Sequence, residues 1–188
     1  MTGADYGPVF QEVFSVRAEI PLVSGTPLPV PELTVDTAFA HHEGALNESF
    51  ARACLAAAYL YADHWDTAHR IAQDLPTREG SYWHAIIHRR EPDYWNSKYW
   101  FRQVGSHPVY PALARAVQEQ VAGDEALLPF ANMVAQGEKW DAFRFVDLCE
   151  EAARKEGPLK RFCLAVQQQE FFLLFDYCYQ HATQTAGR

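Results

Sequence analysis

A short motif that recurs along the chain constrains its fold more than any other feature. In segments 63–73 and 93–103, Asp stands two residues before Trp, and the Trp is followed by Asp or Asn and then by a small residue. Segment 138–146 is a fainter copy. Such side chains accept hydrogen bonds from the unpaired N–H groups of a first helical turn. The motif therefore predicts helices joined by tight turns. The first of these helices is capped by Asp63 or Asp66, and the second by Asp93 or Asn96.

Helical periodicity covers most of the chain beyond residue 45, and Gly or Pro interrupts it at short intervals. Ser81 is the predicted N-cap of one helix, and no segment shows the alternating pattern of a strand. The sequence predicts an all-α fold, a single-domain, solenoid-like bundle of about eight helices. The expected helices span 46–62, 66–75, 82–90, 93–104, 111–122, 124–136, 141–156 and 159–181.

The first 33 residues are the least helical part of the chain. Four prolines between residues 21 and 31 prevent regular structure there, whereas 9–20 is either a short helix or extended. Several apolar side chains give this segment something to bury. We therefore expect 1–33 to be a Pro-rich arm packed on the body, and 34–188 to be a single all-α domain.

The charge and the cysteines narrow the class of protein. The net charge is −8 and the Lys and Arg residues are scattered, so neither nucleic acid nor an anionic membrane is an expected partner. The first ten residues do not resemble a signal peptide, and the longest uncharged apolar run, 53–62, is too short to span a bilayer. The four cysteines lack a C-x-x-C spacing, which predicts reduced core thiols in a cytoplasmic protein.

His84 and His88 stand four residues apart on one predicted helix, so both can face one metal ion. A third ligand would come from another element, with four candidates: His42, His64, His69 and His107. The pair predicts a divalent metal, zinc or manganese, and the alternative is ordinary histidine packing. It resembles the H-x-x-x-H pair of DinB-like proteins, and that resemblance implies one further His from another helix.

Aromatic and titratable residues gather around the same helix. Arg90 is predicted either to bind a carboxylate or phosphate or to satisfy carbonyl groups at its own helix end. Glu91 and Asp66 are the candidate general bases. Helix 93–104 carries aromatic residues nearly all the way round and is expected in the middle of the fold. The predicted small-molecule site consists of Trp83, His84, His88, Arg90, Glu91, Trp95, Asn96 and Tyr99.

Segment 59–113, and above all 83–102, resembles a family of uncharacterised, chiefly bacterial helical proteins. That resemblance implies a single compact unit and no particular activity. The recurring motif is also similar to the turns of tetratricopeptide and Sel1-like helical hairpins, although its copies are 30 and then 45 residues apart. The likeness implies a second function, a non-catalytic helical-repeat module that binds a protein partner.

Overall fold

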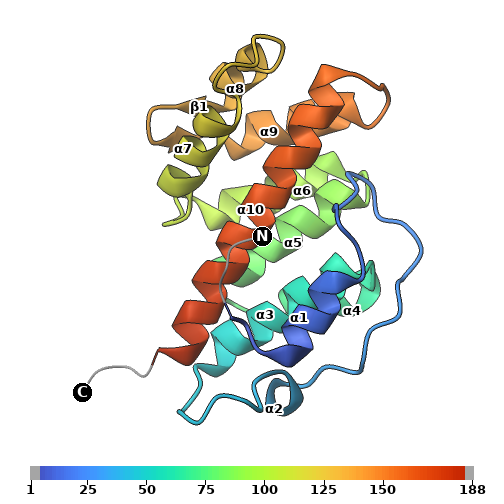
Figure 1. Cartoon of the computed structure of the whole chain (residues 1–188), viewed down its shortest axis with the longest axis vertical. Coiled ribbons are helices and arrows are strands. Elements are labelled where there is room, and N and C mark those ends of the chain that lie inside the picture. Colours follow the sequence, from blue (N-terminus) through green and yellow to red (C-terminus); the bar gives the residue numbers. More distant parts are fainter. Residues whose placement is uncertain (1–4, 185–188) are drawn as a thin grey trace.

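The computed structural model describes residues 5–184, and the regular structure in this part of the chain is almost entirely helical (Figure 1). It contains ten helices and one two-stranded antiparallel hairpin, which confirms the predicted all-α class. The elements are α1 Pro8–Ser15, α2 Val35–Ala38, α3 Glu48–Tyr61, α4 Trp65–Gln73, α5 Arg78–Arg90, α6 Tyr94–Val104, α7 Tyr110–Gln120, α8 Leu128–Val134, β1 Ala135–Gln136, β2 Lys139–Trp140, α9 Ala142–Ala152 and α10 Pro158–Thr183.

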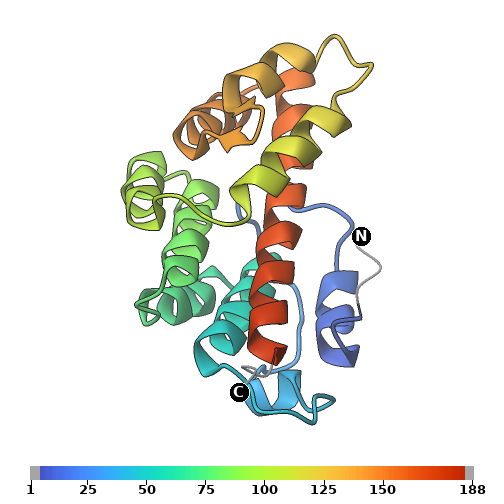
Figure 2. The same ribbon diagram turned by 90° about the vertical axis from the view of Figure 1, so that its left-hand side faces the viewer.

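The longest helix, α10, forms the axis of the molecule (Figure 2). It packs against α3 at one end and against α7 and α9 at the other. Pro158 occupies its first turn, where a missing N–H costs nothing, and neither Gly nor Pro interrupts it afterwards. Its buried side chains include Phe162, Val166, Phe171 and Phe175, so α10 is the element around which the apolar core assembles.

The prediction that helix 93–104 lies in the middle of the fold is wrong. α6 lies at the edge, and Trp95 is 74% exposed while Tyr99 is 42% exposed. These two rings stack on each other, 6.4 Å between centroids, instead of entering the core. An aromatic helix can therefore lie at the surface when its rings pack against one another, because each then covers part of its neighbour's apolar area.

Helix capping explains where several elements begin. Asp93 accepts a hydrogen bond from the Asn96 backbone N–H at 3.2 Å, and Asp141 caps α9 in the same way. In the first copy of the motif neither Asp63 nor Asp66 caps through its side chain, since α4 follows His64 directly. The same local chemistry therefore starts α6 and α9 but not α4.

Several helices begin or end at residues other than the predicted ones. α5 begins at Arg78 and not at residue 82, because Thr77, rather than Ser81, accepts a hydrogen bond from Gly80 N–H at 3.0 Å. A Cβ at Gly80 would lie 2.4 Å from the Leu75 carbonyl oxygen, so glycine permits the close approach of this first turn. The predicted helix 124–136 shortens to α8, and the chain then forms the β1–β2 hairpin, which the sequence pattern did not indicate.

The N-terminal segment contributes to the core. Phe10 and Phe14 of α1 are buried, as are Ile20 and Leu22 beyond it. The backbone of the following stretch is held by hydrogen bonds of 2.8 Å from Ser24 N–H to the Arg90 carbonyl and from Leu28 N–H to the Ala62 carbonyl. This segment thus binds the turn after α3 and the end of α5 at the same time.

A buried polar contact joins α5 to α10. Glu170 accepts hydrogen bonds from the Tyr82 hydroxyl at 3.0 Å and from Arg89 Nη2 at 2.5 Å. Burial alone would lower the pKa of Arg89, but the Glu170 charge raises it above its ordinary value. Arg89 also lies over the Phe145 ring of α9, 4.7 Å from its centroid. The guanidinium therefore fixes three helices relative to one another.

All four cysteines, Cys54, Cys149, Cys163 and Cys178, are buried free thiols. Burial raises the pKa of the Cys54 and Cys178 thiols, which keeps them protonated and unreactive. None of the helices in the described part of the chain has the length and apolar character needed to cross a membrane. The cytoplasmic localisation stays a prediction.

Candidate metal centre

Three histidine side chains meet between α4 and α5. His69 comes from α4, while His84 and His88 come from successive turns of α5, and one ring nitrogen of each lies within 4.8 Å of the other two. The Nε2 atoms of His69 and His84 are 2.8 Å apart. The rings of His84 and His88 are stacked, and the His69 ring stands nearly perpendicular to both. Of the four candidates for a third ligand, the structure thus brings His69 to the pair.

Helix packing explains this arrangement. The i,i+4 spacing places His84 and His88 one above the other on α5. Ala68 and Ala72 are buried on α4, and such small residues let two helices approach closely. Trp100 of α6 covers the cluster from the third side and stacks on His84, 3.9 Å between ring centroids. Nothing in the sequence pattern distinguished Trp100 from the other aromatic residues of its helix.

Polar groups next to His88 complete the cluster. The Asn96 side-chain nitrogen lies 3.1 Å from His88 Nε2. On the other side of the ring, His88 Nδ1 lies 3.1 Å from Glu91 Oε2 and 3.7 Å from Asp93 Oδ2. Neither carboxylate contact has hydrogen-bond geometry, and the buried Nδ1 atoms of His84 and His88 have no hydrogen-bond partner among the described residues. The cluster is therefore buried but incompletely paired.

Burial keeps the imidazoles of His69 and His84 neutral. Burial, together with the neighbouring His69 and His88, lowers the pKa of His84 to about 3. Burial and His88 also lower the pKa of His69, while Glu91 and Asp66 oppose the shift. A neutral imidazole with a free nitrogen lone pair is the form that ligates metals. At neutral pH, His69 and His84 are therefore in the neutral form that can ligate a metal.

The spacing of the nitrogen atoms suits one small cation. Zinc–nitrogen bonds of 2.0–2.1 Å in a tetrahedral arrangement separate two ligating nitrogens by about 3.3 Å. The observed separations, from 2.8 Å to at most 4.8 Å, bracket that value. Imidazole donors suit zinc, whereas manganese prefers carboxylate and carbonyl oxygens. Of the two metals that the sequence predicted, the donor set favours zinc.

Two of the predicted ligand-binding residues face away from the cluster. Trp83 is fully buried and packs on Phe171 of α10, so it belongs to the core and forms no wall of a site. Arg90 is also fully buried, and its guanidinium donates to the carbonyl oxygens of Pro21 and Leu60 and to Asp63. The prediction that Arg90 binds a ligand carboxylate or phosphate is wrong, because all three of its nitrogens already have acceptors within the protein.

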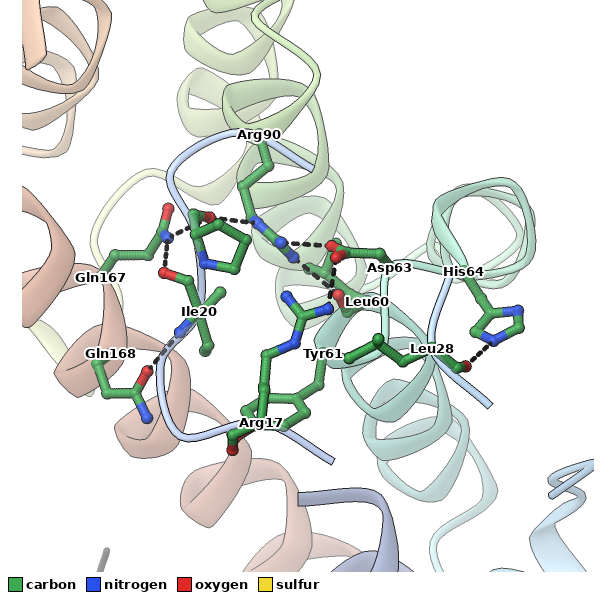
Figure 3. A network of polar contacts seen from close by, with 11 residues as sticks. Arg17, Ile20, Leu28, Leu60, Tyr61, Asp63, His64, Arg90, Gln167 and Gln168 are labelled. Carbon is green, nitrogen blue, oxygen red and sulfur yellow. Dashed lines mark hydrogen bonds and ion pairs between the residues drawn. The ribbon is translucent and has the colours of Figure 1, made fainter. Parts of the chain in front are cut away.

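The contacts of Arg90 form a structural network under the N-terminal segment (Figure 3). Asp63 has a left-handed backbone, φ 61°, and accepts from Arg90 Nη2 through one oxygen and from Arg17 Nη2 through the other, both at 2.5 Å. The Tyr61 hydroxyl donates to the Arg17 carbonyl at 2.8 Å. Burial lowers the pKa of Arg90 to about 10, and Asp63 opposes this shift, so the guanidinium stays charged at neutral pH.

Two other candidate ligands are held elsewhere. His64 Nε2 lies 2.7 Å from the Leu28 carbonyl oxygen, at the edge of the Arg90 network (Figure 3). His107 accepts from the Val109 N–H through Nδ1, and its Nε2 lies 3.6 Å from Glu79 Oε1. His42 does not belong to the cluster. His64 and His107 thus connect loops to helices.

A surface cleft of about 490 Å³ opens beside the cluster. Glu91 belongs to both, since its carboxylate lines the cleft and also lies next to His88. The predicted residues Trp95 and Tyr99 are exposed on α6 and do not line this cleft. Its lining is formed by Val23, Ser24, Trp65, Arg90, Glu91, Pro92 and Asp93.

Comparisons with protein-family models, with curated proteins and with solved structures found no match to this chain. The resemblances drawn from segment 59–113 and from the recurring motif therefore stay predictions. Any function has to be argued from the geometry of the histidine cluster and the cleft next to it.

Proposed function

We propose that this protein binds a divalent metal ion, zinc by its donor set, through His69, His84 and His88, and a small molecule in the adjoining cleft. The observation that carries the proposal is the convergence of three imidazole nitrogens within 4.8 Å of one another. A hydrogen bond between His69 and His84 accounts for only one pair of these atoms. It leaves the approach of His88 to both of these rings unexplained.

The neighbours of His88 support the proposal. Metal-ligating histidines commonly have a carboxylate or carbonyl beside the ring nitrogen that does not face the metal, and this neighbour orients the ring. Glu91 and Asp93 occupy that position beside Nδ1, while Nε2 faces Asn96. His88 is 7% exposed, so a bound ion would be largely shielded from bulk water.

Of the two candidate bases, Glu91 fits a catalytic role better than Asp66. Glu91 touches the histidine cluster and lines the cleft, so it can meet both the ion and a bound small molecule. Asp66 is exposed on the first turn of α4, and its side chain does not line the cleft. We therefore assign the base role, if the cleft is catalytic, to Glu91.

The test is metal analysis of protein purified without a polyhistidine tag, followed by titration with zinc and with manganese. We expect about one zinc per chain and a higher affinity for zinc than for manganese. The double variant His84→Ala/His88→Ala should lose the ion. The control His41→Ala/His181→Ala removes the same number of imidazoles outside the cluster and should keep it.

Thermal melts separate a lost ligand from a lost fold. Zinc at about one hundred times its Kd should stabilise the wild type by about 2.7 kcal/mol and should not shift the melting of the double variant. A wild type that contains no metal and does not melt at a higher temperature with zinc would contradict the proposal. Equal zinc binding by the double variant would also contradict it.

A further inference from the structure

The cleft next to the histidine cluster presents negatively charged groups. Two of its lining residues, Glu91 and Asp93, belong to the turn between α5 and α6. Their side chains are 20% and 49% exposed, so both can reach a ligand. Behind them lies His88 Nδ1, a nitrogen of a 7%-exposed residue that has no hydrogen-bond partner among the described residues. The residues that line the cleft thus include two carboxylates, and an unpaired imidazole nitrogen lies next to them outside the lining.

The arginine expected to dominate this region offsets these charges only in part. Arg90 contributes to the cleft wall, but its guanidinium points inward to Asp63 and two carbonyl oxygens (Figure 3). Arg17 shares Asp63, so this buried group carries two positive charges and one negative, a net charge of +1. Glu91 and Asp93 together carry −2, which leaves −1 for this local set. The whole chain, at −8, adds to the negative potential.

Trp65 supplies an aromatic wall. Its side chain is 39% exposed and lines the cleft at the start of α4. The face of an indole ring attracts cations, and this attraction is strongest for Trp among the aromatic residues. A primary ammonium group has three donors, which two carboxylates can accept. Carboxylates and an indole in one cleft are therefore complementary to a positively charged amine.

We infer that the cleft binds a small organic cation, a primary amine with an apolar body, whose ammonium group lies between Glu91 and Asp93 and whose body contacts Trp65. The inference rests on the small-molecule part of the proposed function and gives that ligand its chemical class. It reverses the charge that Arg90 suggested from the sequence alone. Binding requires no metal, so it can be tested on the metal-free protein.

The first experiment follows the indole N–H resonances of ¹⁵N-labelled, chelator-treated protein by NMR. The resonance that disappears in Trp65→Phe identifies Trp65. Titration with benzylamine should shift this resonance, and benzyl alcohol and benzoate, which share the ring but lack the positive charge, should bind at least about tenfold more weakly. Equal shifts with benzoate, or a Trp65 resonance that benzylamine leaves in place, would overturn the inference.

Matched variants locate the ammonium group. Glu91→Gln and Asp93→Asn should each weaken benzylamine binding about threefold, the size expected for one exposed charge pair. Asn is as good an N-cap as Asp, so Asp93→Asn preserves the start of α6. Asp124→Asn removes an equal charge outside the cleft and should leave the affinity unchanged. An equal loss in all three variants would show a general charge effect and would count against this cleft.

Repeating the titration with zinc distinguishes this inference from the proposed metal site. Zinc binding without benzylamine binding would overturn the inference and leave the metal site intact. Benzylamine binding without zinc binding would overturn the metal site and support the cleft. If both bind, the two positive charges should oppose each other, so each ligand should weaken the other by the same factor.

Discussion

Two buried polar groups lie close together in the sequence and differ in how completely they are paired. Around Asp63 and Arg90, both carboxylate oxygens and all three guanidinium nitrogens have partners. In the histidine cluster, Nδ1 of His84 and of His88 has none among the described residues. Folded proteins pair nearly all their buried polar atoms, and each exception calls for an explanation. Asp63 and Arg90, whose polar atoms are all paired, are thus best understood as structural, although Arg17 Nε beside them has no partner among the described residues, and the histidine cluster is best understood as a binding site.

The strongest way to test the structural half of this comparison is Asp63→Asn. The variant keeps a residue that tolerates the left-handed backbone but leaves the Arg90 guanidinium buried without a counter-charge. Removing one partner of a buried ion pair costs about 3 kcal/mol or more of unfolding free energy. Urea denaturation should show this loss. A change under about 1 kcal/mol would mean that the network contributes far less than its geometry indicates.

The variant Glu91→Gln tests whether the histidine cluster is a metal-binding site. Removing a carboxylate that orients a metal-ligating histidine weakens metal binding by about tenfold, equivalent to about 1.4 kcal/mol. A competition titration against a zinc-binding dye measures this change. Asp124→Asn, which removes an equal charge outside the histidine cluster, serves as the control and should alter the zinc affinity much less.

The lowered pKa of His84 predicts how the metal-free protein responds to acid. Its folded pKa is about 3, against an ordinary value of 6.5. Below pH 6.5 the unfolded chain binds a proton at His84, whereas the folded chain leaves this histidine unprotonated. The free energy of unfolding therefore falls as pH falls from 6.5 towards 3. Between pH 7 and about pH 5.7 the wild type should lose about 1 kcal/mol more than His84→Gln. Chemical denaturation at the two pH values checks this, and parallel losses would contradict it.

The smallest effect is expected at Trp95. This side chain is 74% exposed and stacks only on Tyr99 in the contacts described, so Trp95→Ala should change the unfolding free energy by about 0.5 kcal/mol or less. Trp83→Ala, in the core, should cost about 3 kcal/mol or more. If the two losses were similar, the exposed pair on α6 would have a structural role. If they differ as expected, Trp95 is free to contact the protein partner that the interaction-module hypothesis requires.

Local chemistry was predictable from the sequence. Asp93 and Asp141 cap the helices that follow them because capping depends only on residues within one turn. His84 and His88 could be paired for the same reason, since their spacing alone places them on one face of α5. The predicted all-α class followed from the same kind of pattern.

Contacts between distant elements were not predictable. The direction of Arg90 depends on Asp63, 27 residues earlier, and on the carbonyl of Pro21 in the N-terminal segment. The choice of His69 among four candidate ligands depends on how α4 packs against α5. The position of α6 at the surface depends on α10 occupying the core. Each of these outcomes follows from tertiary packing, which hydrophobic periodicity does not specify.

The central position of α10 has a consequence for the order in which the fold can form. Gln167 donates to the carbonyl oxygens of Ile20 and Pro21, and Glu170 accepts from Arg89, so contacts that hold both the N-terminal segment and α5 come from the last helix. Ribosomal synthesis delivers that helix after all the elements it stabilises. The apolar faces of α3, α7 and α9 therefore stay uncovered until residues 158–183 emerge, and the nascent chain is most exposed to aggregation just before that helix is synthesised.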